Sequence, residues 1–282
     1  MDTSATGRRH AQAGIVSGLW RFPVKSMAGE PLAQADVSWA GLAGDRRWAF
    51  VRPDSQASGF PWHTIREFPQ MSNYVAQLSD PARADRSRVL VRTPGGDLYD
   101  VTDPRLAAEL GPGVRVMRLD RGAFDAMPVS LISDSTVSAL CALADVPRDE
   151  LRFRPNIVVT LGSGAPFEED EWVGAVVRIG TAVVRIDRRD SRCVIVNVDP
   201  ASGAPGARLL RVIGTARRAR AGVYGTTVQP GVIRVGDPVV VEMRRQGQAA
   251  ATLEDVTSKH SALGSEGYPV DASVPARWRR WA

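Results

Sequence analysis

The chain has 282 residues, of which 44% are hydrophobic and 24% charged, so it is long enough to bury a core in one or two domains. No apolar run approaches the ~20 residues that a transmembrane helix needs, and the polar first residues lack the apolar core of a secretory signal. The net charge of +5 comes from arginines spread along the sequence, not from a basic block interleaved with aromatics. We therefore expect a cytoplasmic protein that binds neither membranes nor nucleic acid.

The first part of the chain is dominated by short β-branched runs between Gly, Pro and Asp, a pattern typical of strands. Six strands are predicted before the first helix, at residues 15–22, 32–38, 47–51, 74–78, 89–92 and 98–101. A short helix is predicted from Asp103 to the Gly111-Pro112 stop, and a strand follows it at 114–118.

The second part begins with a predicted strand at 129–132 and the longest predicted helix. This helix has cap candidates at Ser133 and Asp134, carries Cys141 on its apolar stripe and is stopped by Pro147. We expect Cys141 to be a buried structural thiol. Gly180 marks a hairpin turn within "RIGTAVVRI". The remaining strands are predicted at residues 157–160, 176–179, 182–186, 194–198, 225–228 and 239–243.

So many strands with so few helices predict a mainly β, α+β fold built from β-barrels and not from βαβ units. Residues 14–120 are predicted to form an N-terminal β-barrel-like domain and residues 121–245 a second β-barrel domain. About a dozen residues before them form an expected disordered lead. The strand pattern fails after Met243, which makes 246–282 a predicted tail.

Several common kinds of site are excluded by missing residues. "NIVVTLGSGAPF" has Phe167 where a dinucleotide-binding loop needs its third glycine. The three histidines are isolated and no Cys-x-x-Cys occurs, so neither a zinc site nor an iron–sulfur cluster is expected. With two cysteines in the chain, a disulfide framework is not expected either.

Cys193 lies in "RRDSRCVIVNVDP", between a run of charges and an apolar run. One interpretation is a small apolar residue that opens a buried strand. The other is functional, because neighbouring guanidinium groups favour the thiolate, which is a nucleophile and a soft-metal ligand. The residues alone leave both interpretations open.

Four stretches together resemble the MOSC family, the molybdenum-cofactor sulfurase C-terminal domain, with its N-terminal β-barrel domain. They are "RFPVKSMAGEPLAQADVSWAGLAGDRRWAFV", "RFRPNIVV", "SRCVIVNVDPASG" and "GVYGTTVQPGVIRVGDPV". The resemblance covers residues 14–243 and is strongest to the branch of the mitochondrial amidoxime reducing component and its bacterial relatives.

The resemblance implies a molybdenum–molybdopterin cofactor whose metal is ligated by Cys193, which would also be the catalytic residue. It implies a cofactor-binding set of Lys25, Ser26, Arg46, Arg154, Asn156, Ser191, Arg192 and Tyr224. Two further hydrogen-bond donors to the cofactor, Ser135 and Thr136, are expected at the start of the longest predicted helix. Arg47 is the less favoured alternative to Arg46. We expect Pro155 to hold the backbone of Arg154 extended, which would help to aim its side chain.

The implied activity is two-electron reduction of an N-hydroxylated compound, such as an amidoxime, a hydroxamic acid or an N-hydroxy base, with molybdenum taking the oxygen atom. Electrons would come from a separate reductase, ferredoxin or flavoprotein. The chain departs from the branch at Val196 and Asn197, where a Thr-Thr pair is usual, and in an expanded loop with Phe60, Trp62 and His63, which leaves the substrate open. Two other functions stay open: sulfur transfer through a persulfide on Cys193, and a non-enzymatic cofactor carrier.

Overall fold

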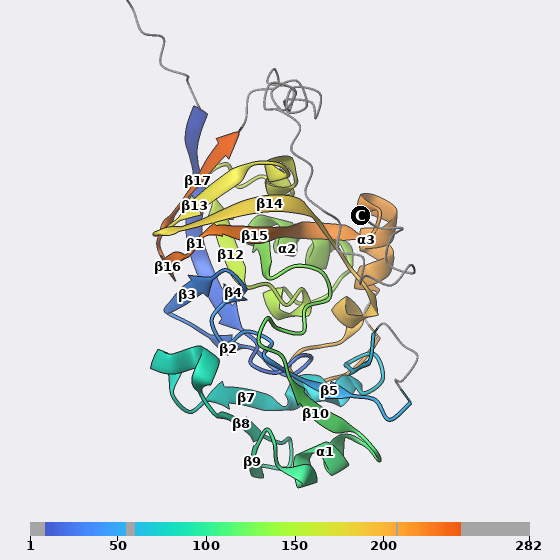
Figure 1. Cartoon of the computed structure of the whole chain (residues 1–282). Coiled ribbons are helices and arrows are strands. Elements are labelled where there is room, and N and C mark those ends of the chain that lie inside the picture. Colours follow the sequence, from blue (N-terminus) through green and yellow to red (C-terminus); the bar gives the residue numbers. More distant parts are fainter. Residues whose placement is uncertain (1–8, 55–59, 207, 244–282) are drawn as a thin grey trace, which may run out of the picture. The chain divides into compact units, whose positions relative to one another are not determined.

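Seven strands form a closed β-barrel in the computed structural model, which describes residues 9–54, 60–206 and 208–243 (Figure 1). Around the barrel the strands are β1 (Arg9–Arg21), β17 (Pro238–Met243), β13 (Val176–Ile179), β14 (Ala182–Ser191), β15 (Arg220–Gln229), β11 (Val129–Ser133) and β12 (Ile157–Leu161). β12 pairs back onto β1 and closes the ring. The β11–β12 pair is parallel and the other six pairs are antiparallel.

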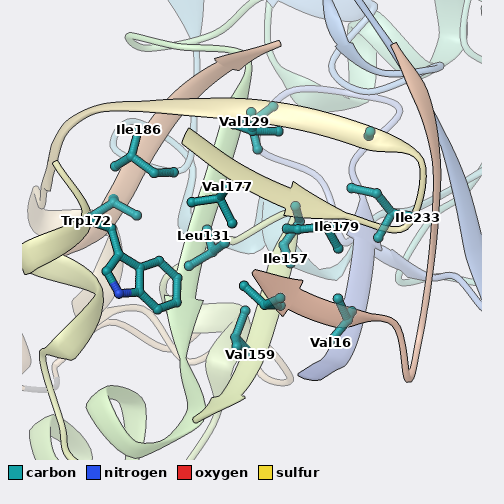
Figure 2. Close-up of a cluster of buried hydrophobic side chains, with 14 of the residues drawn as sticks. Val16, Val129, Leu131, Ile157, Val159, Trp172, Val177, Ile179, Ile186 and Ile233 are labelled. Atoms are coloured by element: carbon teal, nitrogen blue, oxygen red, sulfur yellow. The ribbon is translucent and has the colours of Figure 1, made fainter. Parts of the chain in front are cut away.

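The barrel is filled by inward-facing aliphatic side chains. Figure 2 shows Val16, Leu131, Val159 and Val177 packed together, with Trp172 at one side. β-branched residues suit such positions because they pack well on a pleated surface and lose little further side-chain freedom. The first strand of the chain thus completes a barrel whose other strands come from residues 129–243.

Three smaller sheets come mainly from residues 30–118. They are β16 (Gly231–Arg234) with β3 (Gln34–Ser38) and β4 (Gly41–Leu42), β10 (Arg115–Arg118) with β5 (Trp48–Val51) and β6 (Trp62–His63), and β7 (Val75–Leu78) with β8 (Val89–Arg92) and β9 (Leu98–Asp100). The short β2 (Glu30–Pro31) pairs with the end of β1. β16 and β3 are far apart in sequence yet hydrogen-bonded along four residue pairs, so the early and late parts of the chain are interlocked.

Three α-helices are described: α1 (Pro104–Leu110), α2 (Asp134–Leu143) and α3 (Leu209–Arg217). Asp103 and Ser133 cap α1 and α2 by accepting hydrogen bonds from backbone N–H groups. Cys141 is 1% exposed between α2 and α3, as expected of a structural thiol. The five 3₁₀ segments are η1 (Pro69–Asn73), η2 (Pro81–Arg86), η3 (Glu150–Arg152), η4 (Glu168–Trp172) and η5 (Val194–Asn197).

The predicted mainly β, barrel-based fold is confirmed, and β13 and β14 form the expected hairpin around Gly180. The predicted strand at 194–198 is wrong, because this segment is the 3₁₀ turn η5. The backbone N–H groups of Val196 and Val198 donate to the carbonyls of Cys193 and Ile195, three residues back, so this segment closes on itself and forms no strand ladder. The helix α3 was not predicted.

The predicted division of the chain near residue 120 stays a prediction, since all described residues belong to one compact unit. The predicted tail lies outside the described residues, as does the predicted disordered lead up to residue 8; from Arg9 on that prediction is wrong, because β1 begins there and pairs with β17. Within the described part of the chain, no helix has the length and apolarity needed to cross a bilayer.

Candidate functional site

A cleft lies beside the barrel and is lined by residues 190–193 at the end of β14, by β11, β15 and η5, and by segments before residue 128. Nine of the predicted site residues line it together: Lys25, Ser26, Arg46, Arg154, Asn156, Ser191, Arg192, Cys193 and Tyr224. They come from five separate stretches of sequence, and the closure of the barrel brings those stretches together.

Cys193 lies at the boundary between β14 and η5, where it is half-buried. The guanidinium Nη2 of Arg66 lies 3.2 Å from its Sγ, within hydrogen-bond distance. The same nitrogen lies 3.5 Å from Oδ2 of Asp125, so Arg66 is held between a carboxylate and the thiol. This arrangement places a charged donor directly against the accessible sulfur of Cys193.

Two arginines flank one aromatic ring in the cleft. The guanidinium carbons of Arg46 and Arg154 lie 4.6 Å and 4.3 Å from the centre of the Phe22 ring. Arg46 also forms an ion pair with the fully buried Asp45 and donates to the backbone carbonyl of Arg154. Burial, followed by the charge of Arg46, lowers the pKa of Arg154 to about 9. Nη2 of Arg154 is buried without a hydrogen-bond partner among the described residues. The pair therefore presents positive charge that the chain itself does not neutralise.

Lys25 adds a third buried cation. Its Nζ donates to the backbone carbonyl of Ala123 at 2.7 Å and forms an ion pair with Asp125. Burial lowers the pKa of Lys25, while Asp125 opposes the shift. Burial by itself would raise the pKa of Asp125, but the charges of Lys25 and Arg66 outweigh it and the pKa is lowered. The predicted loop reaches the site through Phe60, whose ring centre lies 5.4 Å from Nζ of Lys25.

The backbone is strained at three cleft residues. Ser26, Arg46 and Arg154 have φ values of 71°, 51° and 51°, in the left-handed region that non-glycine residues rarely adopt. The expectation that Pro155 keeps Arg154 extended is therefore wrong. Ser26 lies in the turn after β1, Arg46 in the turn after β4, and Arg154 in the turn after η3. Such strain concentrates at functional sites.

A buried polar cluster lies at the end of β14. Asp190 is 1% exposed, accepts a hydrogen bond from the Ser130 hydroxyl at 3.1 Å, and lies 2.8 Å from Nη2 of Arg192. Burial raises the pKa of Asp190 to about 6, against the opposing effects of Arg192, Ser130 and Tyr224. Burial also raises the pKa of Tyr224, so its hydroxyl remains protonated and can donate.

Some predicted residues have structural contacts that limit their role. Both ends of the Asn156 side-chain amide bond backbone groups, those of Ser130 and Trp20, and tie barrel strands together. Arg192 donates to two backbone carbonyls, those of Phe153 and Ala221. Each still lines the cleft.

Ser135 and Thr136 do not line this cleft. Ser135 donates to the carbonyl of Ala165, and Thr136 accepts from the N–H of Phe167, so both fasten the loop after β12 to the start of α2. Of the residues that depart from the family pattern, Val196 lines the cleft, while Asn197 caps α3 by accepting from the N–H of Leu210.

The sequence reasoning missed Arg66, Asp125 and Asp190. Arg66 stands in the expanded loop that was singled out for its aromatic residues, so its charge was the available signal. Asp125 and Asp190 gave no signal, because aspartates are common in turns and at strand ends. In the described part of the chain, no group of three or more His, Cys, Asp or Glu residues is placed to hold a metal ion.

The fold and the site define a class of protein: a closed, mainly antiparallel β-barrel that carries an accessible thiol in a cleft rich in basic side chains. Comparison with protein families makes this specific. The MOSC N-terminal beta barrel domain matches residues 13–128 and the MOSC domain matches residues 118–240. The chain belongs to the MOSC domain family and carries both of these domains.

Curated relatives are similar over most of their length. The chain is 27% identical to mitochondrial amidoxime-reducing component 1 of Xenopus laevis, covering 81% of this chain and 82% of the relative. It is 26% identical to mitochondrial amidoxime reducing component 2 of Homo sapiens, and this match covers 82% of this chain and 84% of the relative. Among solved structures, YUAD protein from Bacillus subtilis aligns with 84% of this chain and 100% of its own, at 12% identity and a TM-score of 0.46.

Proposed function

We propose that this protein binds the molybdenum cofactor in the cleft, with Cys193 as the metal ligand, and reduces N-hydroxylated compounds. The observation that carries the proposal is the meeting of one accessible thiol with buried, incompletely paired cations in a single cleft. The names of the amidoxime-reducing relatives support the choice of reaction.

The residues present fit a phosphorylated pterin. Nη2 of Arg154 is a buried donor without an acceptor, and a phosphate oxygen would supply one. Arg46 and Lys25 add charge in the same cleft, and both arginines contact the Phe22 ring, which helps to fix their side chains. A thiolate is the soft ligand that a thiophilic metal prefers. These residues would hold the phosphate at one end and the metal at Cys193.

The bound cofactor would supply the two-electron, oxygen-accepting chemistry. The chain's own residues would do the rest. Arg66 would keep the sulfur of Cys193 oriented, since its guanidinium is itself held by Asp125. The Tyr224 hydroxyl, kept protonated by burial, would donate a hydrogen bond inside the cleft. The apolar side chains of Ile195 and Val196 would limit water at the metal.

A separate electron donor completes the proposed reaction: a reductase, ferredoxin or flavoprotein. The basic balance of the chain, +5 overall, favours an acidic partner. A cytoplasmic location stays a prediction.

The test is the molybdenum content per chain, measured by elemental mass spectrometry on protein expressed in a host that makes the cofactor. We expect near-stoichiometric metal in the wild type and in Cys141→Ala, which removes the buried cysteine outside the cleft, and almost none in Cys193→Ala. Reduction of benzamidoxime by reduced methyl viologen should follow the metal content. Metal-free wild type from a competent host would refute the proposal, and sulfane sulfur on Cys193 would then support sulfur transfer. Full metal content without reduction of any N-hydroxylated compound would instead indicate a carrier.

A further inference from the structure

The carboxyl group of Asp190 is only partly accounted for by contacts within the chain. It lines the cleft with 1% of its surface exposed, which places it at the inner wall. Oδ2 accepts the hydrogen bond from Ser130 and contacts Arg192. Oδ1 has no hydrogen-bond partner of good geometry among the described residues; the Tyr224 hydroxyl is close enough to lower the pKa of the carboxyl, but no direct bond to Oδ1 is formed. Because an unpaired buried carboxylate oxygen carries a large desolvation cost, a missing donor from a ligand is the expected compensation.

The backbone of β14 is irregular where it places this carboxyl. The register between β14 and β15 shifts between Ile186 and Arg188, and again between Arg189 and Ser191. Asp190 lies within the second irregularity. Bulges of this kind re-aim a side chain and are frequent beside active sites. As a result Asp190 points inward, while the next residue, Ser191, is exposed.

Oδ1 of Asp190 differs from the other carboxylate oxygens of the cleft because it is not paired with a cation. The other acidic residue of the cleft lining, Asp125, is held by Lys25 and Arg66. The remaining charged residues of the lining are arginines. Among the described lining residues, Oδ1 of Asp190 is therefore the acidic oxygen left for a ligand. A ligand that satisfies the whole cleft combines an anionic group with an N–H donor.

We propose that Asp190 is a further ligand-binding residue whose Oδ1 accepts a hydrogen bond from an amino-bearing N–C–NH₂ edge. Two molecules of the proposed reaction carry that edge: the 2-aminopyrimidinone ring of the pterin and the amidoxime substrate. The inference rests on the proposed function and adds to it the residue that recognises this edge. Substitution by Asn tests it sharply. The amide oxygen would remain toward Ser130 and Arg192, which places the amide N–H₂ at the position of Oδ1, where it would face another donor.

The experiment uses holoprotein from a cofactor-producing host and compares wild type, Asp190→Asn, Asp190→Ala and Asp187→Asn. Asp187 is the matched control: it lies on the same strand, pairs with Arg185 and Thr226, and does not line the cleft. Pterin loss during dialysis is followed by the fluorescence of the oxidised pterin, together with molybdenum content. KM is measured for benzamidoxime, which carries the N–C–NH₂ edge, and for benzhydroxamic acid, which does not. Circular dichroism verifies that each variant is folded.

If the pterin is the ligand, Asp190→Asn loses it about tenfold to a hundredfold faster than wild type does. Asp190→Ala loses it at an intermediate rate, and the Asp187→Asn control loses it at the wild-type rate. If the substrate is the ligand, pterin retention is unchanged and KM rises about tenfold in Asp190→Asn for benzamidoxime alone. A purely structural role predicts the opposite order, with Ala worse than Asn, because Asn preserves shape and the bond to Ser130. That order, or no change in either measurement, would overturn the inference while leaving the proposed function intact. Wild type without pterin would refute both.

Discussion

Replacement of Asp190 by Asn should remove a pH dependence of stability that this one carboxyl creates. Burial raises its pKa from 3.8 to about 6, although Arg192 and Ser130 oppose the shift. The folded chain thus holds this proton to higher pH than the unfolded chain does. The stability that the carboxyl contributes is fully present below about pH 4 and is lost as the pH rises to about 6. At 1.36 kcal/mol per pH unit, the loss is about 3 kcal/mol.

The assay is urea unfolding of cofactor-free protein, followed by tryptophan fluorescence between pH 2.5 and pH 7.5. We expect the free energy of unfolding of wild type, relative to Asp190→Asn, to fall by about 3 kcal/mol up to pH 6.5 and then to stay level. Other carboxyl groups are common to both proteins and cancel in this difference. Asp125→Asn provides a control of opposite sign, because the pKa of Asp125 is lowered and its contribution is lost as the pH falls. A relative stability that is flat or that rises between pH 4 and pH 6.5 would contradict the reasoning.

Three further substitutions test other parts of the cleft. Arg66→Gln removes the charged donor to Cys193, so iodoacetamide should alkylate that thiol about tenfold more slowly in cofactor-free protein; an unchanged rate would deny the contact any role. Phe22→Leu removes the ring that both Arg46 and Arg154 contact and should weaken inorganic phosphate binding, measured by calorimetry, by about fivefold; unchanged or tighter binding would show that the ring does not hold them. Gly222→Ala should lower the free energy of unfolding by about 2 kcal/mol or more, because φ is +71° and the new Cβ would lie 2.7 Å from the carbonyl oxygen of Leu131; wild-type stability would refute this.

The errors in the predicted fold have a common physical origin. The run after Cys193 has strong β propensity, but its backbone bonds close a 3₁₀ turn, and Val196 packs in that turn against Leu209 and Ile213 of α3. In α3 the apolar positions Leu209 and Ile213 are buried against neighbouring elements, while interspersed arginines and Gly214 weaken the local helical pattern. Both segments take their form from partners distant in sequence.

The sequence by itself determined the kinds of residue that make this cleft: the thiol of Cys193, the cations Lys25, Arg46 and Arg154, and the strands that carry them. Side-chain chemistry and β propensity are local properties, which a linear pattern records. Only the tertiary structure decided which charges remain unpaired. It engages Asp125 with Lys25, brings Arg66 to the thiol, and buries Asp190 with one oxygen free. Pairing and desolvation depend on distances across a closed barrel, and those distances are set when β12 pairs back onto β1.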